Sequence, residues 1–102
     1  MSDRITVIAK ISAAEGKRAD LAAGLQPALD AAEGEPGTLS YILLEDAVEA
    51  NTLWMYETYE NQAALDAHMG SDAFKALGSA IGPFLAGRPE LHFVKVIGGK
   101  GA

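Results

Sequence analysis

Apolar and polar side chains alternate in several short segments, which is typical of β-strands. In residues 4–11, every second side chain falls on one apolar face, made of Ile5, Val7, Ala9 and Ile11. Residues 38–46 and 52–59 are rich in aliphatic and aromatic side chains and are separated by a polar stretch, which predicts a hairpin. Residues 91–97 return to the same composition and predict a last strand.

Between the first two strands, the spacing of apolar residues changes to that of a helix. They recur on one face of a helix predicted over residues 15–33: Leu21, Leu25, Leu29 and Ala32. Pro27 lies inside this helix, and its missing N–H and its ring are expected to kink it, at a cost of about 3 kcal/mol unless packing compensates. The Glu-Pro-Gly sequence at residues 35–37 marks the end of this helical segment, because the residue before a proline avoids the α region.

Two further helices are predicted after the hairpin. Asn61 is a suitable N-cap for a short helix that ends at Met69, and Gly70 followed by Ser71 indicates a stop and a new N-cap. The third helix is expected to end within residues 83–87. Its predicted buried stripe consists of Phe74, Leu77, Ile81, Phe84 and Leu85.

This order of elements predicts an α+β protein with a ferredoxin-like βαββαβ fold and an antiparallel sheet. The 102 residues contain no linker-like stretch, so we expect one domain over residues 1–102, with residues 98–102 as a flexible tail. The two hairpin strands are apolar on both faces, so the second face of the sheet also needs cover. The simplest cover is the sheet of a second copy, which predicts a homodimer paired through sheet faces.

Charge and composition narrow the set of partners and cofactors. The net charge is −6 and the basic residues are scattered, which argues against a nucleic-acid partner. No apolar run approaches the roughly 20 residues that cross a bilayer, and the first residues lack a signal-peptide pattern, so we expect no membrane partner and a cytoplasmic location. Cysteine is absent and His68 and His92 are far apart in sequence, so we expect no metal site.

Two pieces of the chain resemble the antibiotic biosynthesis monooxygenase (ABM) domains. The first is the helix exit Glu-Pro-Gly-Thr-Leu-Ser-Tyr at residues 35–41. The second covers residues 56–68, where the family's Glu-x-aromatic, Ala-Leu and His pattern is followed by Ser-Asp-Ala-Phe at residues 71–74. The resemblance spans nearly the whole chain and implies a dimeric α+β barrel of the quinol-monooxygenase type, which uses no cofactor.

Departures from the family pattern narrow the expected ligand. Haem-degrading relatives use an axial histidine where this chain has Gly78, so the resemblance does not imply haem. Anthrone-type oxygenases use an asparagine, a tryptophan and a tyrosine at positions that are here Met55, Tyr59 and Leu65. These replacements weaken the case for an anthrone, and the substrate that the resemblance implies is a small aromatic or quinol-like molecule.

The resemblance leaves His68, Glu57 and Tyr59 as candidate catalytic residues. His68 is the candidate base, because the ordinary pKa of histidine lies close to working pH; capping a helix end is the competing role. Glu57 lies among apolar residues and needs a partner, since an unpaired buried charge is costly. We expect it to orient His68 or Tyr59. The alternative is a structural or dimer contact with one of three basic residues, Lys10, Arg88 or Lys95.

Three further aromatic residues are candidate substrate contacts: Tyr41, Trp54 and Phe74. Tyrosines offer a flat apolar surface together with a hydroxyl, which suits an aromatic ligand. Trp54 projects to the opposite side of its strand from Glu57, so a core or dimer-face role competes with substrate binding. Tyr41 has core packing as its alternative.

The leading functional hypothesis is a cofactor-independent monooxygenase that oxidises a small aromatic or quinol-like molecule with O2. A second enzymatic hypothesis is an isomerase or another proton-transfer enzyme that uses the same pocket, because Glu57 and His68 can move a proton without oxygen. A third is a dimeric binding module without catalysis.

Overall fold

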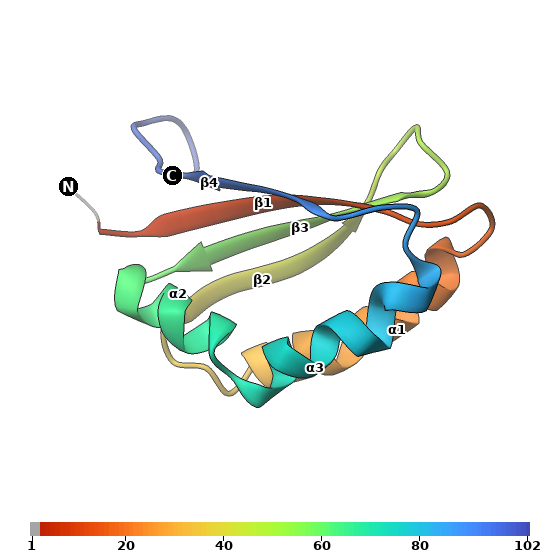
Figure 1. Ribbon diagram of the computed structural model, residues 1–102. Helices are drawn as coiled ribbons and strands as arrows, with labels where there is room; N and C mark the ends of the chain where they lie inside the picture. The colour runs from red at the N-terminus through yellow and green to blue at the C-terminus, as the bar shows by residue number, and fades with distance from the viewer. Residues whose placement is uncertain (1–2) are drawn as a thin grey trace.

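The computed structural model describes residues 3–102, and its elements follow the predicted order. They are β1 (Ile5–Ser12), α1 (Arg18–Ala32), β2 (Thr38–Glu45), β3 (Thr52–Tyr59), α2 (Gln62–Met69), α3 (Asp72–Ile81), a 3₁₀ turn (Gly82–Phe84) and β4 (Glu90–Val94). The strands form one antiparallel sheet in the order β2-β3-β1-β4. The helices lie on one side of this sheet (Figure 1). The predicted α+β, ferredoxin-like fold is therefore confirmed.

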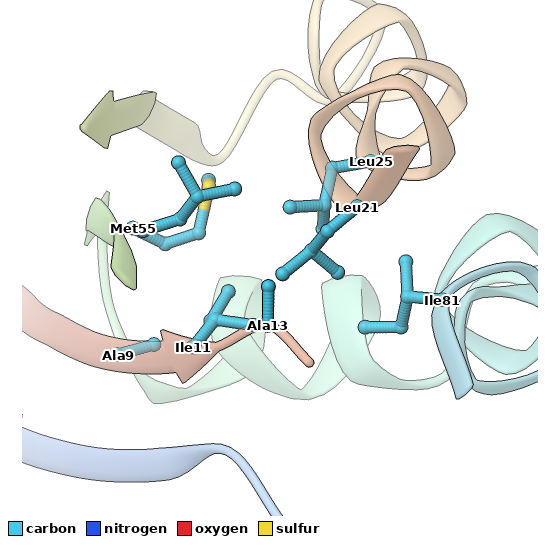
Figure 2. Close-up of a cluster of buried hydrophobic side chains, with 8 residues drawn as sticks. Ala9, Ile11, Ala13, Leu21, Leu25, Met55 and Ile81 are labelled. Atoms are coloured by element: carbon cyan, nitrogen blue, oxygen red, sulfur yellow. The ribbon is translucent and has the colours of Figure 1, made fainter. Parts of the chain in front are cut away.

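The main core lies between the inner face of the sheet and the helices α1 and α3. The residues of β1 predicted to share one apolar face are all buried: Ile5, Val7, Ala9 and Ile11. Leu21 and Leu25 of α1 and Ile81 of α3 pack against this face, as Figure 2 shows. Burial of these apolar side chains stabilises the layer by about 25 cal/mol for each Å² removed from water.

Two helix ends differ from the predictions, the first because of the backbone angle of a glycine and the second because the chain returns to the sheet. The first helix begins at Arg18 rather than at residue 15, since Gly16 adopts a φ of +76°, which no helix contains. It then continues through Pro27. The third helix ends at Ile81, and the chain behind it returns to β1, where the Ala86 N–H donates to the Ser12 carbonyl at 2.8 Å. Of the predicted stripe on this helix, only Ile81 is fully buried.

The outer face of the sheet carries exposed apolar side chains. Ile42, Tyr56 and Ile8 sit side by side across β2, β3 and β1, with exposed fractions of 48%, 38% and 36%. Strict alternation along β2 would place Leu39 on the face of Tyr41, but Leu39 is exposed because a bulge between Thr38 and Ser40 shifts the register. Within residues 3–102, no helix is long and apolar enough to cross a membrane.

Candidate functional site

The sequence around α2 places His68 under the sheet. The Asn61 side chain accepts a hydrogen bond from the Ala64 N–H at 2.9 Å, which is the predicted N-cap. Ser71 caps α3 by accepting from the Phe74 N–H at 3.2 Å, and its hydroxyl donates to the His68 carbonyl at 2.7 Å. These bonds fix the corner between α2 and α3. As a result, the His68 side chain is buried, with 5% of the residue exposed.

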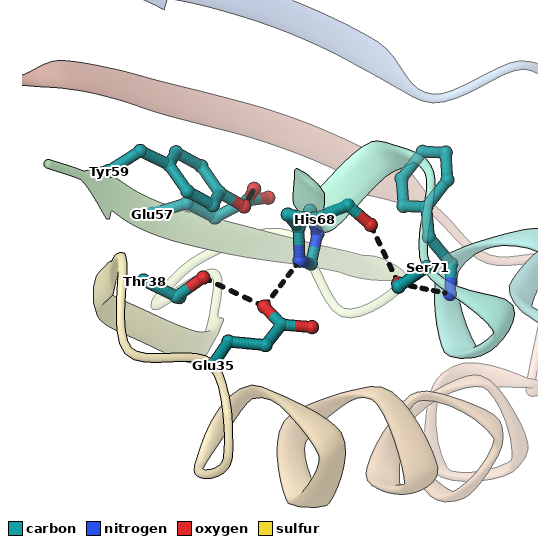
Figure 3. Close-up of polar contacts among 7 residues, drawn as sticks. Glu35, Thr38, Glu57, Tyr59, His68 and Ser71 are labelled. Carbon is teal, nitrogen blue, oxygen red and sulfur yellow. Dashed lines mark hydrogen bonds and ion pairs between the residues drawn. The ribbon is translucent and has the colours of Figure 1, made fainter. Parts of the chain in front are cut away.

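A carboxylate from the turn after α1 contacts His68. Glu35 Oε1 lies 2.9 Å from His68 Nδ1, and the Thr38 hydroxyl donates to the same oxygen at 2.7 Å (Figure 3). The other imidazole nitrogen, Nε2, is buried and has no hydrogen-bond partner among residues 3–102. Buried polar atoms are nearly always hydrogen-bonded, so an unpartnered ring nitrogen calls for a functional explanation.

Three aromatic rings surround the imidazole. Their centroids lie 5.0 Å (Tyr41), 5.2 Å (Tyr59) and 5.4 Å (Phe74) from the centroid of His68. Burial raises the pKa of Tyr41, and the negative charges of Glu57 and Glu35 raise it further. The Tyr41 hydroxyl therefore stays protonated and can donate a hydrogen bond to an anion.

Glu57 and Tyr59 form a buried pair on β3. The Tyr59 hydroxyl donates to Glu57 Oε1 at 2.5 Å, so within this chain the partner of Glu57 is the tyrosine, one of the two residues that it was expected to orient. Burial raises the pKa of the Glu57 carboxyl, although the hydrogen bond from Tyr59 and the charge of His68 oppose the rise. Burial also raises the pKa of Tyr59, together with its bond to Glu57.

A cavity of about 450 Å³ opens beside this cluster, between the sheet and α3. Tyr41, Glu57 and Phe74 line it, whereas His68 and Tyr59 are outside its lining, although the His68 ring lies against Tyr41 and Phe74. The remaining wall is mostly apolar and includes Met55, Met69, Leu77, Gly78 and Leu91. This size and character suit one small organic molecule, with its polar groups directed at Glu57 and Tyr41.

Trp54 is the one predicted substrate contact that the structure places elsewhere. It lies on the outer face of the sheet, where its Nε1–H donates to Asp46 Oδ2 at 2.8 Å and Lys10 lies over its ring at 5.9 Å. Backbone N–H groups of Glu49 and Val48 and this indole bond lower the pKa of Asp46 to about 2. The alternative role of Trp54 as a dimer-face residue fits this position on the outer face better than contact with a ligand in the cavity does.

Sequence reasoning missed the role of Glu35, which entered only as part of the helix exit. It lies 33 residues from His68, so no local spacing connects the two. The available signal was the tight Pro-Gly turn that follows it, because such a turn brings the end of α1 close to α2.

The fold and the cavity define a small α+β protein with a mostly apolar cavity between its sheet and helices. The family model of the antibiotic biosynthesis monooxygenases matches residues 4–78, and the chain belongs to that family.

Solved structures agree with this assignment. A "putative antibiotic biosynthesis monooxygenase" from Caulobacter crescentus is 32% identical, with a TM-score of 0.86 over 95% of this chain and 92% of that one. The protein PA3566 from Pseudomonas aeruginosa is 26% identical, with a TM-score of 0.86 over 96% and 98% of the two chains. The uncharacterised protein sll1783 from Synechocystis is 30% identical over 94 residues, which are 92% of this chain and 64% of the relative. This chain therefore spans less than two thirds of that relative's length.

Proposed function

We propose that this protein is a cofactor-independent monooxygenase that oxidises a small aromatic or quinol-like molecule with O2. The observation that carries the proposal is the unpartnered Nε2 of His68, buried behind an apolar cavity that Tyr41 and Glu57 line. An aromatic ring fits between the apolar walls, with one hydroxyl directed at the polar end.

Deprotonation of the substrate is the first step of the proposed reaction. His68 is not in the cavity wall, so the substrate hydroxyl has to reach Nε2 between the lining side chains Tyr41 and Phe74, which lie against its ring. Nε2 then accepts the proton, because a neutral imidazole is a suitable base near neutral pH. The negative charge that develops on the substrate oxygen is met by hydrogen-bond donors. Tyr41 supplies one donor, because burial raises the pKa of its hydroxyl. Glu57 supplies a second when its carboxyl is protonated, a state that burial favours by raising its pKa. The apolar walls limit access of water to the anion.

Oxygen then reacts with the electron-rich anion itself. For a hydroquinone, one oxygen atom enters the ring, the other leaves as water, and the product is a hydroxyquinone. The substrate supplies all the electrons that reduce O2, so the reaction balances without an external reductant. The role of the protein in this step is to hold the anion in a site that water does not reach.

Oxygen consumption with a panel of hydroquinones, anthrones and flavonoid-like phenols tests the proposal. We expect uptake with at least one of them and a loss of roughly 100-fold or more in His68→Gln, because general-base catalysis contributes about 10² to 10⁴ to a rate. Val48→Lys is a matched surface control, since Val48 is 88% exposed in the turn between β2 and β3. Unchanged turnover in His68→Gln would exclude His68 as the base.

A second candidate is a proton-transfer enzyme, such as an isomerase, that uses the same pocket. The influence of His68 on the buried Glu57 carboxyl favours it, because the protonated member of such a pair can give a proton while the unprotonated member takes one. Turnover without oxygen uptake would support this candidate. Saturable binding without turnover would instead indicate a binding module.

We also propose that two copies pair through the outer faces of their sheets. Ile8, Ile42 and Tyr56 form an exposed apolar row there, and Leu44 extends it with an exposed fraction of 45%. Contiguous apolar patches of this kind commonly mark interfaces. Pairing would remove them from water without closing the cavity, which lies on the other face of the sheet.

A further inference from the structure

Glu35 contacts the buried histidine on one side and solvent on the other. The side chain of His68 is 6% exposed, whereas that of Glu35 is 22% exposed. Glu35 lines a surface hollow of about 140 Å³ that it shares with Tyr41, and Tyr41 also lines the larger cavity. The charge of Glu35 therefore stays partly hydrated, so it can lie beside the ring without the full cost of burying a carboxylate.

The turn after α1 holds this contact in place. The Glu60 N–H donates to the Gly37 carbonyl at 2.9 Å, which ties the turn to the end of β3. Gly37 packs directly on α2, where a Cβ at this position would lie 2.5 Å from the Cβ of Ala64. Only a glycine allows so close an approach. The contact between Glu35 and His68 is thus built into the packing of the turn against α2.

The carboxylate determines which nitrogen of His68 carries the proton. A carboxylate only accepts hydrogen bonds, so the neutral imidazole beside it must hold its proton on Nδ1. The Thr38 hydroxyl donates to the same oxygen at 2.7 Å and keeps it in position. The lone pair of the neutral ring is then on Nε2, the buried nitrogen that lacks a partner among residues 3–102.

We propose that Glu35 is a positioning residue that holds His68 in the Nδ1–H form and so leaves the lone pair on Nε2 to accept a proton, so that the cavity selects acidic phenols or enols that ionise when they bind. This inference rests on the proposed function in one respect, namely that the ligand occupies the cavity next to His68. When the ligand O–H bond breaks, its electron pair stays on the ligand oxygen and the proton bonds to Nε2. The resulting imidazolium lies between the ligand anion and the Glu35 carboxylate, and no electron is transferred.

The tautomer can be measured without any ligand. In ¹⁵N-labelled protein, two-bond ¹⁵N–¹H correlation spectra distinguish the two nitrogens of each imidazole, and exposed His92 serves as the internal reference. We expect neutral His68 in the Nδ1–H form. Glu35→Gln should lose this preference, because a carboxamide can donate as well as accept. Glu35→Asp, which keeps a carboxylate, and Glu33→Gln, on the exposed end of α1, should retain it. A wild-type Nε2–H form, or an unchanged spectrum in Glu35→Gln, would overturn the proposal.

The ligand class is tested with para-nitrophenol, whose absorbance reports its ionisation, and with nitrobenzene, which has the same ring and no acidic proton. We expect the ionised fraction of bound para-nitrophenol to exceed that of the free probe at the same pH. Glu35→Gln should weaken its binding roughly tenfold, as expected for loss of one charged hydrogen bond, and leave nitrobenzene unaffected. Equal losses for both probes, or no binding of either, would overturn the ligand class. If the tautomer and probe results are as expected but no oxygen is taken up, only the oxygenase function is contradicted.

Discussion

Tyr59 and Glu57, two residues apart on β3, join their side chains through a buried hydrogen bond of 2.5 Å. In Tyr59→Phe, the ring stays but the donor to the Glu57 carboxyl is lost. We expect the free energy of unfolding to fall by about 1 to 3 kcal/mol, the usual cost of leaving a buried polar group without its partner. Urea unfolding measures the change. Tyr56→Phe, on the exposed outer face, is the matched control and should differ little from the wild type.

Glu57 should also make the stability depend on pH. Burial raises the pKa of its carboxyl above the ordinary value of 4.5, so the folded state binds this proton more tightly than the unfolded state does. The contribution is therefore complete below the ordinary pKa and is lost as pH rises through the higher pKa of the folded protein. Glu57→Gln cannot titrate and still accepts from Tyr59.

The measurement is the difference in free energy of unfolding between Glu57→Gln and the wild type, taken across the acid to neutral range. We expect this difference to move in favour of the variant as pH rises. A constant difference would mean that Glu57 has the same proton affinity in the folded and unfolded states.

The sequence predicted the elements of this fold well because the signals are local. Asn61 and Ser71 cap helices through bonds that reach only three residues along the chain. The cavity site depends on longer-range packing. The hairpin strands are apolar on both faces, so alternation alone could not show which face the helices cover, and Trp54 was included among the ligand contacts. The partner of His68 was missed for the same reason, since Glu35 reaches it only through the packing of a turn on α2.

Gly37 provides a test of that packing. A methyl group at this position would lie 2.5 Å from the Cβ of Ala64, so the turn or α2 must shift. We expect Gly37→Ala to reduce the free energy of unfolding by about 1 to 3 kcal/mol, as overpacking does. Adding Ala64→Gly removes the opposing methyl and should restore part of the loss, beyond the roughly 1 kcal/mol that a glycine costs inside a helix. A double-mutant cycle gives the coupling energy, and additive effects would contradict a direct clash.

Substitutions at Gly78 can distinguish effects on the stability of α3 from effects on the volume of the cavity. It lines the cavity, and a Cβ built on it meets no atom within 4 Å. Gly78→Ala should therefore stabilise the protein by about 0.5 to 1 kcal/mol, because glycine is unfavourable in a helix interior. Gly78→Leu should keep most of this gain and place a larger side chain in the cavity.

Binding of para-nitrophenol to these two variants completes the comparison. We expect Gly78→Leu to bind the probe at least several-fold more weakly than Gly78→Ala, while both are at least as stable as the wild type in urea. Equal binding by the two variants would place the ligand outside this cavity.

The outer face of the sheet is tested through the mass of the protein in solution. Ile42 lies in the exposed apolar row and is already 48% exposed, so Ile42→Lys should disturb the folded chain little. In a pair of sheets, the same lysine would bring a charge into an interface that normally removes about 800 Å² of each partner from water. Sedimentation velocity should therefore show a dimer for the wild type and a shift towards the monomer for Ile42→Lys.

Val48→Lys adds the same charge in the turn between β2 and β3, where the side chain is 88% exposed, and should leave the dimer intact. If both lysine variants dissociate the dimer equally, net charge rather than the apolar row is responsible. A wild-type protein that sediments as a monomer at micromolar concentration would remove the pairing of sheets altogether. Because the cavity lies on the opposite face, a monomeric Ile42→Lys that still binds para-nitrophenol would show that ligand binding does not require the partner.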